Sequence, residues 1–369
     1  MLATRCLRLG YTAIMKPLFF RHDPEVVHEK ITQLGACMGR YRLTQKLAQT
    51  LLQYRHPALQ QTLCGIHFSN PIGLAAGFDK NAQLTTILPS VGFGFEEVGS
   101  ITGEPCAGNP KPRLWRLPQS KGLLVYYGLM NDGCEAIAAH LKKTHSTIPI
   151  GTSIAKTNSP ATATLEAGIA DYAKAFRVLA DIGDYTTINI SCPNAYGGEP
   201  FTDPERFDAL MMELDTIKTH KPIFIKLPAE LSLAHMDELL RIAERHRIHG
   251  WIPSNLVKDR KNPSIIPSEI EGKNRGGVSG LPVREKSNEM ISHIHGRVGT
   301  RYVIIGCGGV FTAKDAYEKI RRGASLIQLI TGMIYEGPQL IGEINRGLVD
   351  LLHKDGYENI SQAVGSLHQ

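Results

Sequence analysis

The sequence predicts an α/β fold: a (β/α)8 TIM barrel preceded by an N-terminal two-helix segment that associates with a membrane. Two observations predict the barrel. Eight short apolar runs alternate with helical stretches, and polar or glycine residues gather where those runs end. Near-continuous apolar runs of this kind are typical of parallel strands buried on both faces. A doubly wound open sheet is the alternative. We expect residues 1–57 to form the N-terminal segment and residues 58–369 to form the barrel.

Length and composition describe an ordinary globular protein. The chain has 369 residues, of which 42% are hydrophobic and 21% charged, enough for one large domain or two average ones. These values exclude a disordered chain, a collagen-like repeat and a disulfide-stabilised miniprotein. The seven cysteines are odd in number and never spaced as Cys-x-x-Cys, which predicts free thiols in a reducing compartment and no metal site.

The net charge of +6 is confined to the start of the chain. Residues 1–60 contain nine basic and three acidic side chains, whereas the rest of the chain has 32 charges of each sign. A nucleic-acid-binding protein would carry its charge on the functional face, so no nucleic-acid partner is expected. A basic appendage on a neutral body instead predicts contact with an anionic membrane surface.

The N-terminal segment is predicted to form two short helices. Asp23 is a suitable N-cap for a helix that begins at Pro24, and Pro57 ends the second helix. Apolar residues recur at helical spacing: Val27, Ile31, Leu34 and Met38, then Leu43, Leu47 and Leu51. Amphipathic helices with basic flanks fit an interfacial membrane anchor, and a helical cap packed on the barrel is the alternative. No run of 18 apolar residues occurs, so no spanning helix is expected.

The predicted strands and helices follow in order after residue 60. Strands are expected at Ile72–Phe78, Phe95–Ser100, Ile150–Ala155, Thr186–Ser191, Ile223–Leu227, Gly250–Asn255, Tyr302–Gly308 and Leu326–Thr331. Helices are expected between most of them, for example at Ala161–Leu179, Asp203–Lys218, Leu233–Arg247 and Ala313–Arg322. The polar connection from Lys258 to Gly280 has the composition of a mobile lid.

A glycine motif at the end of the seventh predicted strand points to a phosphate. Gly306-Cys307-Gly308-Gly309 precedes a helix that begins near Thr312, where glycines let backbone N–H groups approach an anion at a helix N-terminus. Loops after strands seven and eight are the usual phosphate site of such barrels. Together with Gly276–Gly280 and Thr331-Gly332, the motif predicts a phosphorylated ligand. Tight turns without a ligand are the alternative.

Two lysines, Lys80 and Lys226, follow predicted strands, where a buried ammonium group needs a partner. One of them could form a Schiff base with a carbonyl substrate. Because the two lysines lie on different strands, compensation of an anionic substrate or of a reduced cofactor fits better.

The run Asn189-Ile190-Ser191-Cys192-Pro193-Asn194 ends the fourth predicted strand. A thiol with an ordinary pKa of about 8.5 can act as a nucleophile or a proton acceptor near neutral pH. The flanking asparagines offer donors and acceptors to a planar, amide-rich substrate. A buried structural cysteine among turn asparagines is the alternative.

Several stretches of the chain match a known family. They are Asn70–Lys80, Gly92–Ser100, Gly108–Arg113 with Arg116-Leu117-Pro118, Asn189–Asn194, Gly276–Gly280, Ile304–Val310 and Gly323–Pro338, with Asp23-Pro24-Glu25 and His28-Glu29 at the N-terminal segment. The chain resembles the dihydroorotate dehydrogenases of class 2, which are membrane-associated and reduce a quinone.

The resemblance implies an FMN-binding barrel that oxidises dihydroorotate to orotate, a step of pyrimidine biosynthesis, with a quinone as electron acceptor. Cys192 would be the general base, and Lys226 would stabilise the reduced flavin. FMN contacts would fall at Ala76, Gly77, Lys80, Ser100, Asn189, Lys226, Ser254, Gly280, Gly309 and Thr331. Substrate contacts would fall at Lys80, Asn189, Asn194 and Asn255, and Arg116 would lie by the quinone tunnel under the N-terminal helices.

The chain also departs from the family at its base and substrate positions. Cys192 stands where class 2 members usually have serine, and a thiol is more acidic than a hydroxyl and needs less activation. In the substrate loop, Val125 replaces the expected asparagine. Leu256 stands in place of a threonine, and Ser153 in place of an asparagine that contacts FMN. Each lost contact is worth about 0.5–1.5 kcal/mol, so orotate recognition could be weakened by orders of magnitude.

Three functions follow as alternatives: a quinone-dependent dihydroorotate dehydrogenase, an FMN-dependent oxidoreductase of the same superfamily acting on another cyclic amide or enoyl compound, and a redox-silent membrane-associated barrel. NAD is not expected as acceptor, because the chain has neither a cysteine cluster nor a Gly-x-Gly-x-x-Gly motif. The expected location is peripheral on a membrane and facing a reducing compartment. That is the cytoplasmic side of a bacterial inner membrane, or the mitochondrial inner membrane in a eukaryote.

Overall fold

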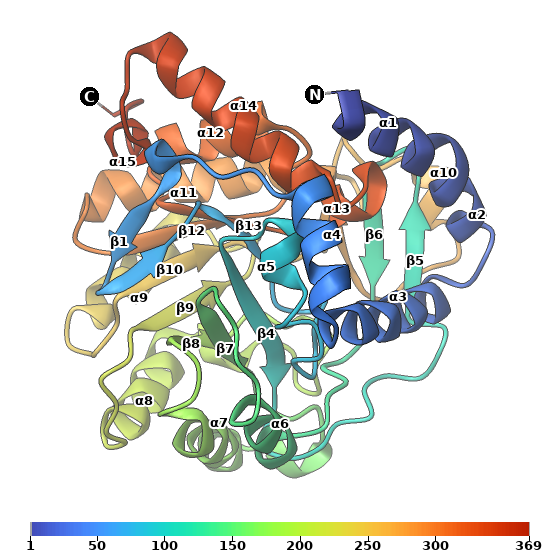
Figure 1. Ribbon diagram of the computed structural model, residues 1–369. Coiled ribbons are helices and arrows are strands. Elements are labelled where there is room, and N and C mark those ends of the chain that lie inside the picture. Colours follow the sequence, from blue (N-terminus) through green and yellow to red (C-terminus); the bar gives the residue numbers. More distant parts are fainter. Residues whose placement is uncertain (1, 369) are drawn as a thin grey trace.

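The computed structural model describes residues 2–368 and shows a closed barrel of eight parallel strands surrounded by helices (Figure 1). The strands follow one another around the barrel in chain order, and β13 pairs with β3 to close it. They are β3 (Ile72–Leu74), β4 (Phe95–Ile101), β7 (Ile150–Ile154), β8 (Tyr185–Asn189), β9 (Ile223–Leu227), β10 (Gly250–Pro253), β12 (Val303–Cys307) and β13 (Leu326–Leu329). Each overlaps its predicted run, so the barrel is confirmed and the open sheet is wrong.

Large aromatic residues fill the barrel beside glycines of the neighbouring strands. A side chain at Gly73 would collide with the ring of Phe95, and a side chain at Gly151 would collide with the ring of Tyr185. These rings belong to one buried cluster: Phe68, Phe95, Tyr185, Phe224, Ile252, Ile305 and Leu326. Alternation of large and small residues lets adjacent strands fill a closed interior without voids.

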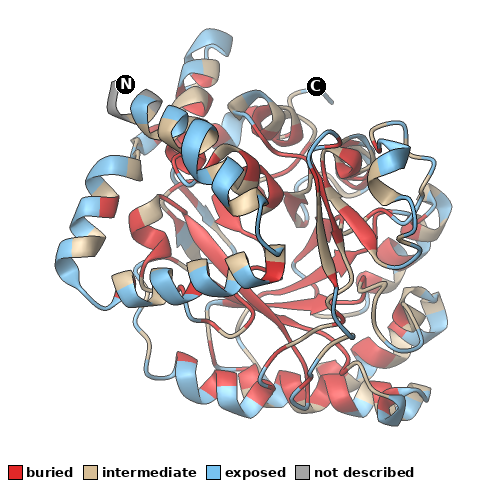
Figure 2. Cartoon of the chain, turned by 90° about the vertical axis from the view of Figure 1, so that its right-hand side faces the viewer, coloured by how far each residue is buried: buried red, intermediate tan, exposed pale blue. Residues whose placement is uncertain are grey.

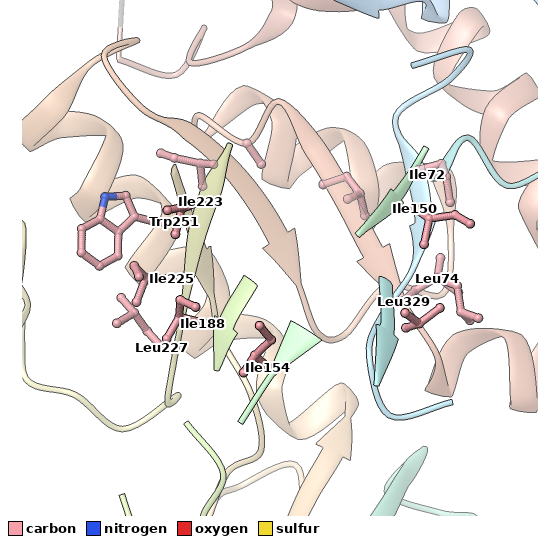
Figure 3. Close-up of a cluster of buried hydrophobic side chains, with 14 of the residues drawn as sticks. Ile72, Leu74, Ile150, Ile154, Ile188, Ile223, Ile225, Leu227, Trp251 and Leu329 are labelled. Carbon is pink, nitrogen blue, oxygen red and sulfur yellow. The ribbon is translucent and has the colours of Figure 1, made fainter. Parts of the chain in front are cut away.

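The outward faces of the strands form the main hydrophobic core with the surrounding helices. Figure 3 shows part of this layer, in which Trp251 of β10 lies beside aliphatic side chains of β9, and further aliphatic side chains of β3, β7 and β13 lie across the barrel from it. Trp251 is completely buried. Burial of both faces explains why the strands read as continuous apolar runs in the sequence.

The barrel helices are α5 (Leu88–Val91), α6 (Cys134–Leu141), α7 (Leu165–Leu179), α8 (Pro204–Asp215), α9 (Leu233–Ala243), α11 (Arg284–Val298), α12 (Ala313–Arg321), α13 (Thr331–Glu336), α14 (Leu340–Asp355) and α15 (Ile360–Ala363). Side-chain caps set several of the starts. Thr164 accepts a hydrogen bond from the Ala167 N–H, so α7 begins later than the predicted Ala161. Ser232 caps α9 in the same way at His235.

Two small antiparallel sheets close the ends of the barrel, and the sequence did not predict either. The hairpin of β1 (Gln61–Leu63) and β2 (Ile66–Phe68) covers one end of the barrel interior. It places the ring of Phe68 there, with its centroid 5.5 Å from that of Phe95. The second sheet has the order β11-β6-β5, with β5 at Leu114–Leu117, β6 at Gly122–Val125 and β11 at Gly277–Gly280.

The connection predicted as a mobile lid is anchored to this second sheet. It contains α10 (Pro267–Ile270), and the carboxylate of Glu269 accepts hydrogen bonds from the N–H groups of Gln119 and Ser120 at 2.9 Å. Its last residues form β11, which pairs with β6. The segment is therefore held in place both in its middle and at its end.

The N-terminal segment contains α1 (Leu2–Gly10), a π-helical turn (Tyr11–Met15), α2 (Lys16–Phe20), α3 (Pro24–Gly39) and α4 (Arg42–Leu52). The predicted start of α3 is confirmed, because the Asp23 carboxylate accepts from the N–H groups of Glu25 and Val26. The helices before Asp23 were not predicted. Within residues 2–368, no helix has both the length and the apolar character needed to cross a bilayer.

A buried ion pair joins α3 to the barrel. The Glu25 carboxylate lies 2.8 Å from the guanidinium of Arg113, and both side chains are almost fully buried. The outer surface of the segment is exposed instead (Figure 2). It carries large apolar side chains, with Leu43 and Leu47 of α4 80% and 58% exposed. Ala48 of α4 faces the protein. The segment thus packs on the barrel and keeps an apolar outer face, while the domain boundary near residue 57 stays a prediction.

Candidate active site

A cavity of about 210 Å³ lies at the carboxyl ends of the barrel strands, between them and the second sheet. This is the end at which barrel enzymes build their sites. Most of the residues that the sequence singled out line this cavity: Ala76, Gly77, Lys80, Ser100, Asn189, Cys192, Asn194, Lys226, Asn255, Gly280, Gly309 and Thr331. Residues separated by up to 255 positions therefore meet at one place.

Two predicted site residues do not line the cavity. Ser254 is completely buried behind it, and its hydroxyl lies 3.5 Å from the carbonyl oxygen of Cys307. Arg116 turns toward the N-terminal segment, where it donates to the carbonyl of His22 at 2.7 Å and lies over the ring of Phe20 at 4.8 Å. Arg116 does lie against the N-terminal helices, as expected, but it is not among the residues that line the cavity.

Asn189 and Asn255 share one hydrogen-bond network with Ser100 and Ser191, whereas Asn194 makes a separate hydrogen bond. Asn189 donates to the Ser100 hydroxyl at 2.7 Å and accepts from the Ser191 hydroxyl at 2.7 Å. Asn255 donates to Ser191, and Asn194 donates to the carbonyl of Val125 at 2.9 Å. Because Asn194 and Asn255 use their side-chain N–H groups in this way, their side-chain oxygens are left to accept hydrogen bonds from a ligand.

Lys80 and Lys226 bring two ammonium groups to the same cavity. Both side chains are buried, and neither donates a hydrogen bond to another residue in the part of the chain that the structure describes. Burial lowers the pKa of Lys80 to about 8, and its ammonium lies 4.1 Å from the centroid of the Tyr127 ring. Two unpaired cations, one from the loop after β3 and one from β9, favour an anionic ligand over a single Schiff base.

Cys192 lies between this cavity and a second one of about 10 Å³, which has room for about one water molecule. Lys156 and Glu199 line the second cavity as well. Burial raises the pKa of the Cys192 thiol to about 11, although the backbone N–H groups of Asn194 and Ala195 oppose the rise. The thiol is therefore protonated at neutral pH and needs more activation than its ordinary pKa implies.

The glycine loop after β12 can receive an anion, but not at the helix N-terminus that the sequence suggested. The Asp315 carboxylate already occupies the start of α12, where it accepts from the Phe311 N–H at 3.0 Å. Gly308 and Gly309 both have positive φ angles and line the cavity. Within residues 2–368, neither of their N–H groups has a hydrogen-bond partner. A phosphate would therefore meet the loop itself.

The comparisons with known proteins agree with this geometry. Residues 58–352 match the family model described as dihydroorotate dehydrogenase. The chain belongs to the dihydroorotate dehydrogenase family. A relative from Acaryochloris marina named dihydroorotate dehydrogenase (quinone) is 37% identical, with 96% of this chain and 99% of that protein covered. One of the same name from Haloarcula marismortui is 35% identical, with 96% and 98% covered. A solved dihydroorotate dehydrogenase of Eimeria tenella in complex with ferulenol has a TM-score of 0.82 and 26% identity, with 94% of this chain and 96% of that chain covered.

The three departures from the family pattern occupy different places. Val125 and Leu256 line the cavity, so apolar surface stands where the family presents polar groups. Ser153 is completely buried, and its hydroxyl lies 2.8 Å from the hydroxyl of Ser100. Ser153 therefore acts on the cavity through Ser100, while the other two change the ligand surface directly.

Sequence reasoning missed two residues that shape this dihydroorotate dehydrogenase site. Tyr127 lines the cavity and presents its ring to both Lys80 and Arg113. Asn109 donates to the carbonyl oxygen of Asn194 at 3.0 Å and so holds the loop that follows Cys192. The aromatic pair Tyr126-Tyr127 before a glycine was a signal for the first of these, whereas nothing in the sequence linked Asn109 to a loop 85 residues away.

Proposed function

We propose that this protein oxidises dihydroorotate to orotate with bound FMN and transfers the electrons to a quinone. The observation that carries the proposal is the single cavity in which Cys192, two buried lysines and the asparagine network meet the free N–H groups of the glycine loop. Membership of the dihydroorotate dehydrogenase family and the names of its quinone-dependent relatives point to the same reaction.

The residues of the cavity fit FMN. Gly308 and Gly309 offer free N–H groups to the phosphate, and a side chain at either position would collide with Val283 or Arg284. Gly280 is equally crowded, since a side chain there would collide with the backbone of Lys121. Bound FMN would accept two electrons from the substrate and pass them to the quinone. Lys226 would compensate the negative charge that the flavin gains.

The substrate would lie between Cys192 and the asparagines. Cys192, as the thiolate, would accept the proton from the substrate carbon next to the one that is oxidised, and Lys80 would hold the substrate carboxylate. Asn194 and Asn255 would accept hydrogen bonds from the ring N–H groups. Because the thiol has a pKa of about 11, only a small thiolate fraction is present at neutral pH, and the substrate must be held close to it.

The quinone would enter beside the N-terminal segment. The cavity wall there is apolar, with Leu114, Leu123 and Ile334 from β5, β6 and α13, and His28 of α3 also lines it. Burial lowers the pKa of His28 to about 3, so its ring is neutral at physiological pH and can exchange hydrogen bonds without carrying a charge. An apolar wall suits a hydrophobic quinone ring, and the exposed apolar face of α4 would bring this entrance to a membrane.

A peripheral membrane location follows from the same segment. Among the described residues, most of the exposed large hydrophobic side chains belong to the first 51 residues: Leu9, Ile14, Met15, Leu18, Val26, Leu34, Tyr41, Leu43, Leu47 and Leu51. Residues 1–60, which include this region, carry the whole net charge of +6. Basic and apolar residues on one segment together hold a protein at an anionic leaflet.

Anaerobic mixing of the purified protein with dihydroorotate tests the reaction. We expect the yellow colour of the flavin to bleach and to return when a soluble quinone is added. Cys192→Ala should slow the bleaching by about 10²–10⁴-fold while FMN stays bound, because a positioned base contributes that much. Cys64→Ala is the matched control, since Cys64 is exposed. Normal bleaching by Cys192→Ala would refute the assignment of the base.

A related substrate is the second candidate, because Val125 and Leu256 give the cavity apolar surface where polar groups are expected. The protein would then be an FMN-dependent oxidoreductase of the same superfamily that acts on another cyclic amide or enoyl compound. The bleaching experiment separates the two: FMN that stays yellow with dihydroorotate but bleaches with another dihydropyrimidine favours this candidate.

Vesicle binding tests the membrane location. Leu43→Gln with Leu47→Gln should weaken sedimentation with anionic vesicles, because both side chains are exposed and apolar. Met212→Gln is the control, since Met212 is 62% exposed on the barrel helix α8. Removal of residues 1–57 is a less clean test because it takes Glu25 away from the buried Arg113. Equal sedimentation of the native protein, the Leu43/Leu47 double variant and Met212→Gln would contradict the membrane location.

A further inference from the structure

Lys319 is a buried cation that the proposed reaction does not use. It lies on α12, and its side chain is completely inaccessible to solvent. A buried charge is costly unless an opposite charge or several hydrogen bonds compensate it, so such a residue calls for an explanation.

The Lys319 ammonium is linked through one serine to the glycine loop. It donates to the Ser287 hydroxyl at 2.9 Å and to the side-chain oxygen of Asn288 at 2.8 Å. The Ser287 hydroxyl in turn donates to the carbonyl oxygen of Cys307 at 2.7 Å. Cys307 is the residue before Gly308, so the cation lies directly behind the loop with the free N–H groups.

No carboxylate compensates this cation. Among residues 2–368, no acidic side chain lies within ion-pair distance of Lys319, and both hydrogen-bond acceptors are neutral. The acidic groups around it are Glu318 and Asp315 of its own helix and Glu285 of α11, with the Cys307 thiol of β12. Burial outweighs their attraction and lowers the pKa of Lys319 to about 7.

We propose that Lys319 is a positioning residue for the phosphate of the flavin: its charge, set behind the glycine loop by Ser287, is the counter-charge of a phosphate bound at Gly308 and Gly309. The inference rests on the proposed function, because it takes FMN as the ligand. A phosphate dianion in the loop would supply the negative charge that the surroundings of Lys319 lack. The hydrogen bonds through Ser287 would keep the Cys307 carbonyl turned toward the helices and the glycine N–H groups turned toward the ligand.

A choice between two flavins tests the charge. FMN and riboflavin share the ring system and differ by the phosphate, so the purified holoenzyme is dialysed against an equal mixture of both. The bound flavins are then released and separated by chromatography. The native protein should retain mainly FMN, and Lys319→Met should lower the bound ratio of FMN to riboflavin by about tenfold or more, since it removes a buried charge near the phosphate. A general loss of packing would affect both flavins equally and leave the ratio unchanged.

Two further variants separate charge from hydrogen bonding and from helix stability. Lys319→Gln keeps a donor for Ser287 but is neutral, so it should lower the ratio as Lys319→Met does. Lys314→Met changes an exposed lysine of the same helix and should leave the ratio at the native value. A native ratio in Lys319→Gln would overturn the inference, and so would a native ratio in a folded Lys319→Met protein. Failure of the native protein to bind either flavin would instead overturn the proposed function.

Discussion

The buried ion pair between Glu25 and Arg113 should decide whether the N-terminal segment stays docked. Glu25→Gln preserves the size of the side chain but leaves Arg113 as a buried cation without a counter-charge. Arg113 also donates to the carbonyl oxygens of Ala107 and Asn109 at 2.8 and 2.9 Å, so it cannot turn away to solvent without breaking these bonds. Loss of one partner of a buried pair costs about 3–5 kcal/mol.

Glu29→Gln is the matched control on the same helix. Glu29 faces Lys111 at 3.7 Å, and both side chains are about half exposed, so this pair should contribute no more than about 1 kcal/mol. In urea unfolding, Glu25→Gln should shift the midpoint of the transition down by roughly 1 M or more if the slope is near 3 kcal/mol per M. Glu29→Gln should shift the urea midpoint by only about a few tenths of 1 M.

The pH dependence gives an independent check of the same pair. Burial disfavours the charged form of Glu25, but the hydrogen bonds and charges of Arg113 and Lys111 hold the pKa of Glu25 below its ordinary value of 4.5. A depressed pKa stabilises the folded state above the unfolded pKa, and this stabilisation is lost as the pH falls through the folded pKa. The stability difference between the native protein and Glu25→Gln should therefore be full at neutral pH and shrink below about pH 4.5. Equal midpoint shifts for the Glu25 and Glu29 variants would refute the reasoning.

Three other predictions concern the site itself. The rate of Cys192 alkylation, followed by mass spectrometry as a function of pH, should show a thiol pKa near 11. Glu199→Gln should lower this pKa by less than about one pH unit, because the negative charge of Glu199 raises the pKa of the thiol. An unchanged pH profile of alkylation would show that Glu199 does not act on the thiol. Gly309→Ala should lose bound flavin, since the position has a φ of +72° and a side chain there would collide with α11 at a strain of about 1–3 kcal/mol. Gly197→Ala, with a φ of +77° and open space around it, should retain the flavin. The His28 ring should show no titration by NMR between pH 5 and 8, because its pKa is about 3; a midpoint in that range would contradict its burial.

The local pattern of residues was enough to predict the barrel. A parallel strand buried on both faces must be apolar along its whole length, so each strand can be recognised in the sequence without knowledge of its neighbours. The rule that barrel sites lie at the carboxyl ends of strands then brought Lys80, Asn189, Cys192 and Lys226 together before any contact was known. Both inferences use information that lies within a few residues of each strand.

Other features depend on pairings between distant parts of the chain. The second sheet joins β6 and β11, which are about 150 residues apart, and neither strand carries a signal for its partner. The hydrogen bond from Asn109 to Asn194 likewise joins distant parts of the chain.

The sequence by itself therefore determined the barrel, the end at which the site is built and most of the residues that line it. Only the tertiary structure decided which way side chains face and what surrounds them. It turned Leu43 and Leu47 outward, enclosed Lys319 without a carboxylate and raised the pKa of the Cys192 thiol. The reason is physical: strand and helix patterns arise from neighbours in the chain, whereas burial and electrostatic environment arise from residues that meet only after the chain has folded.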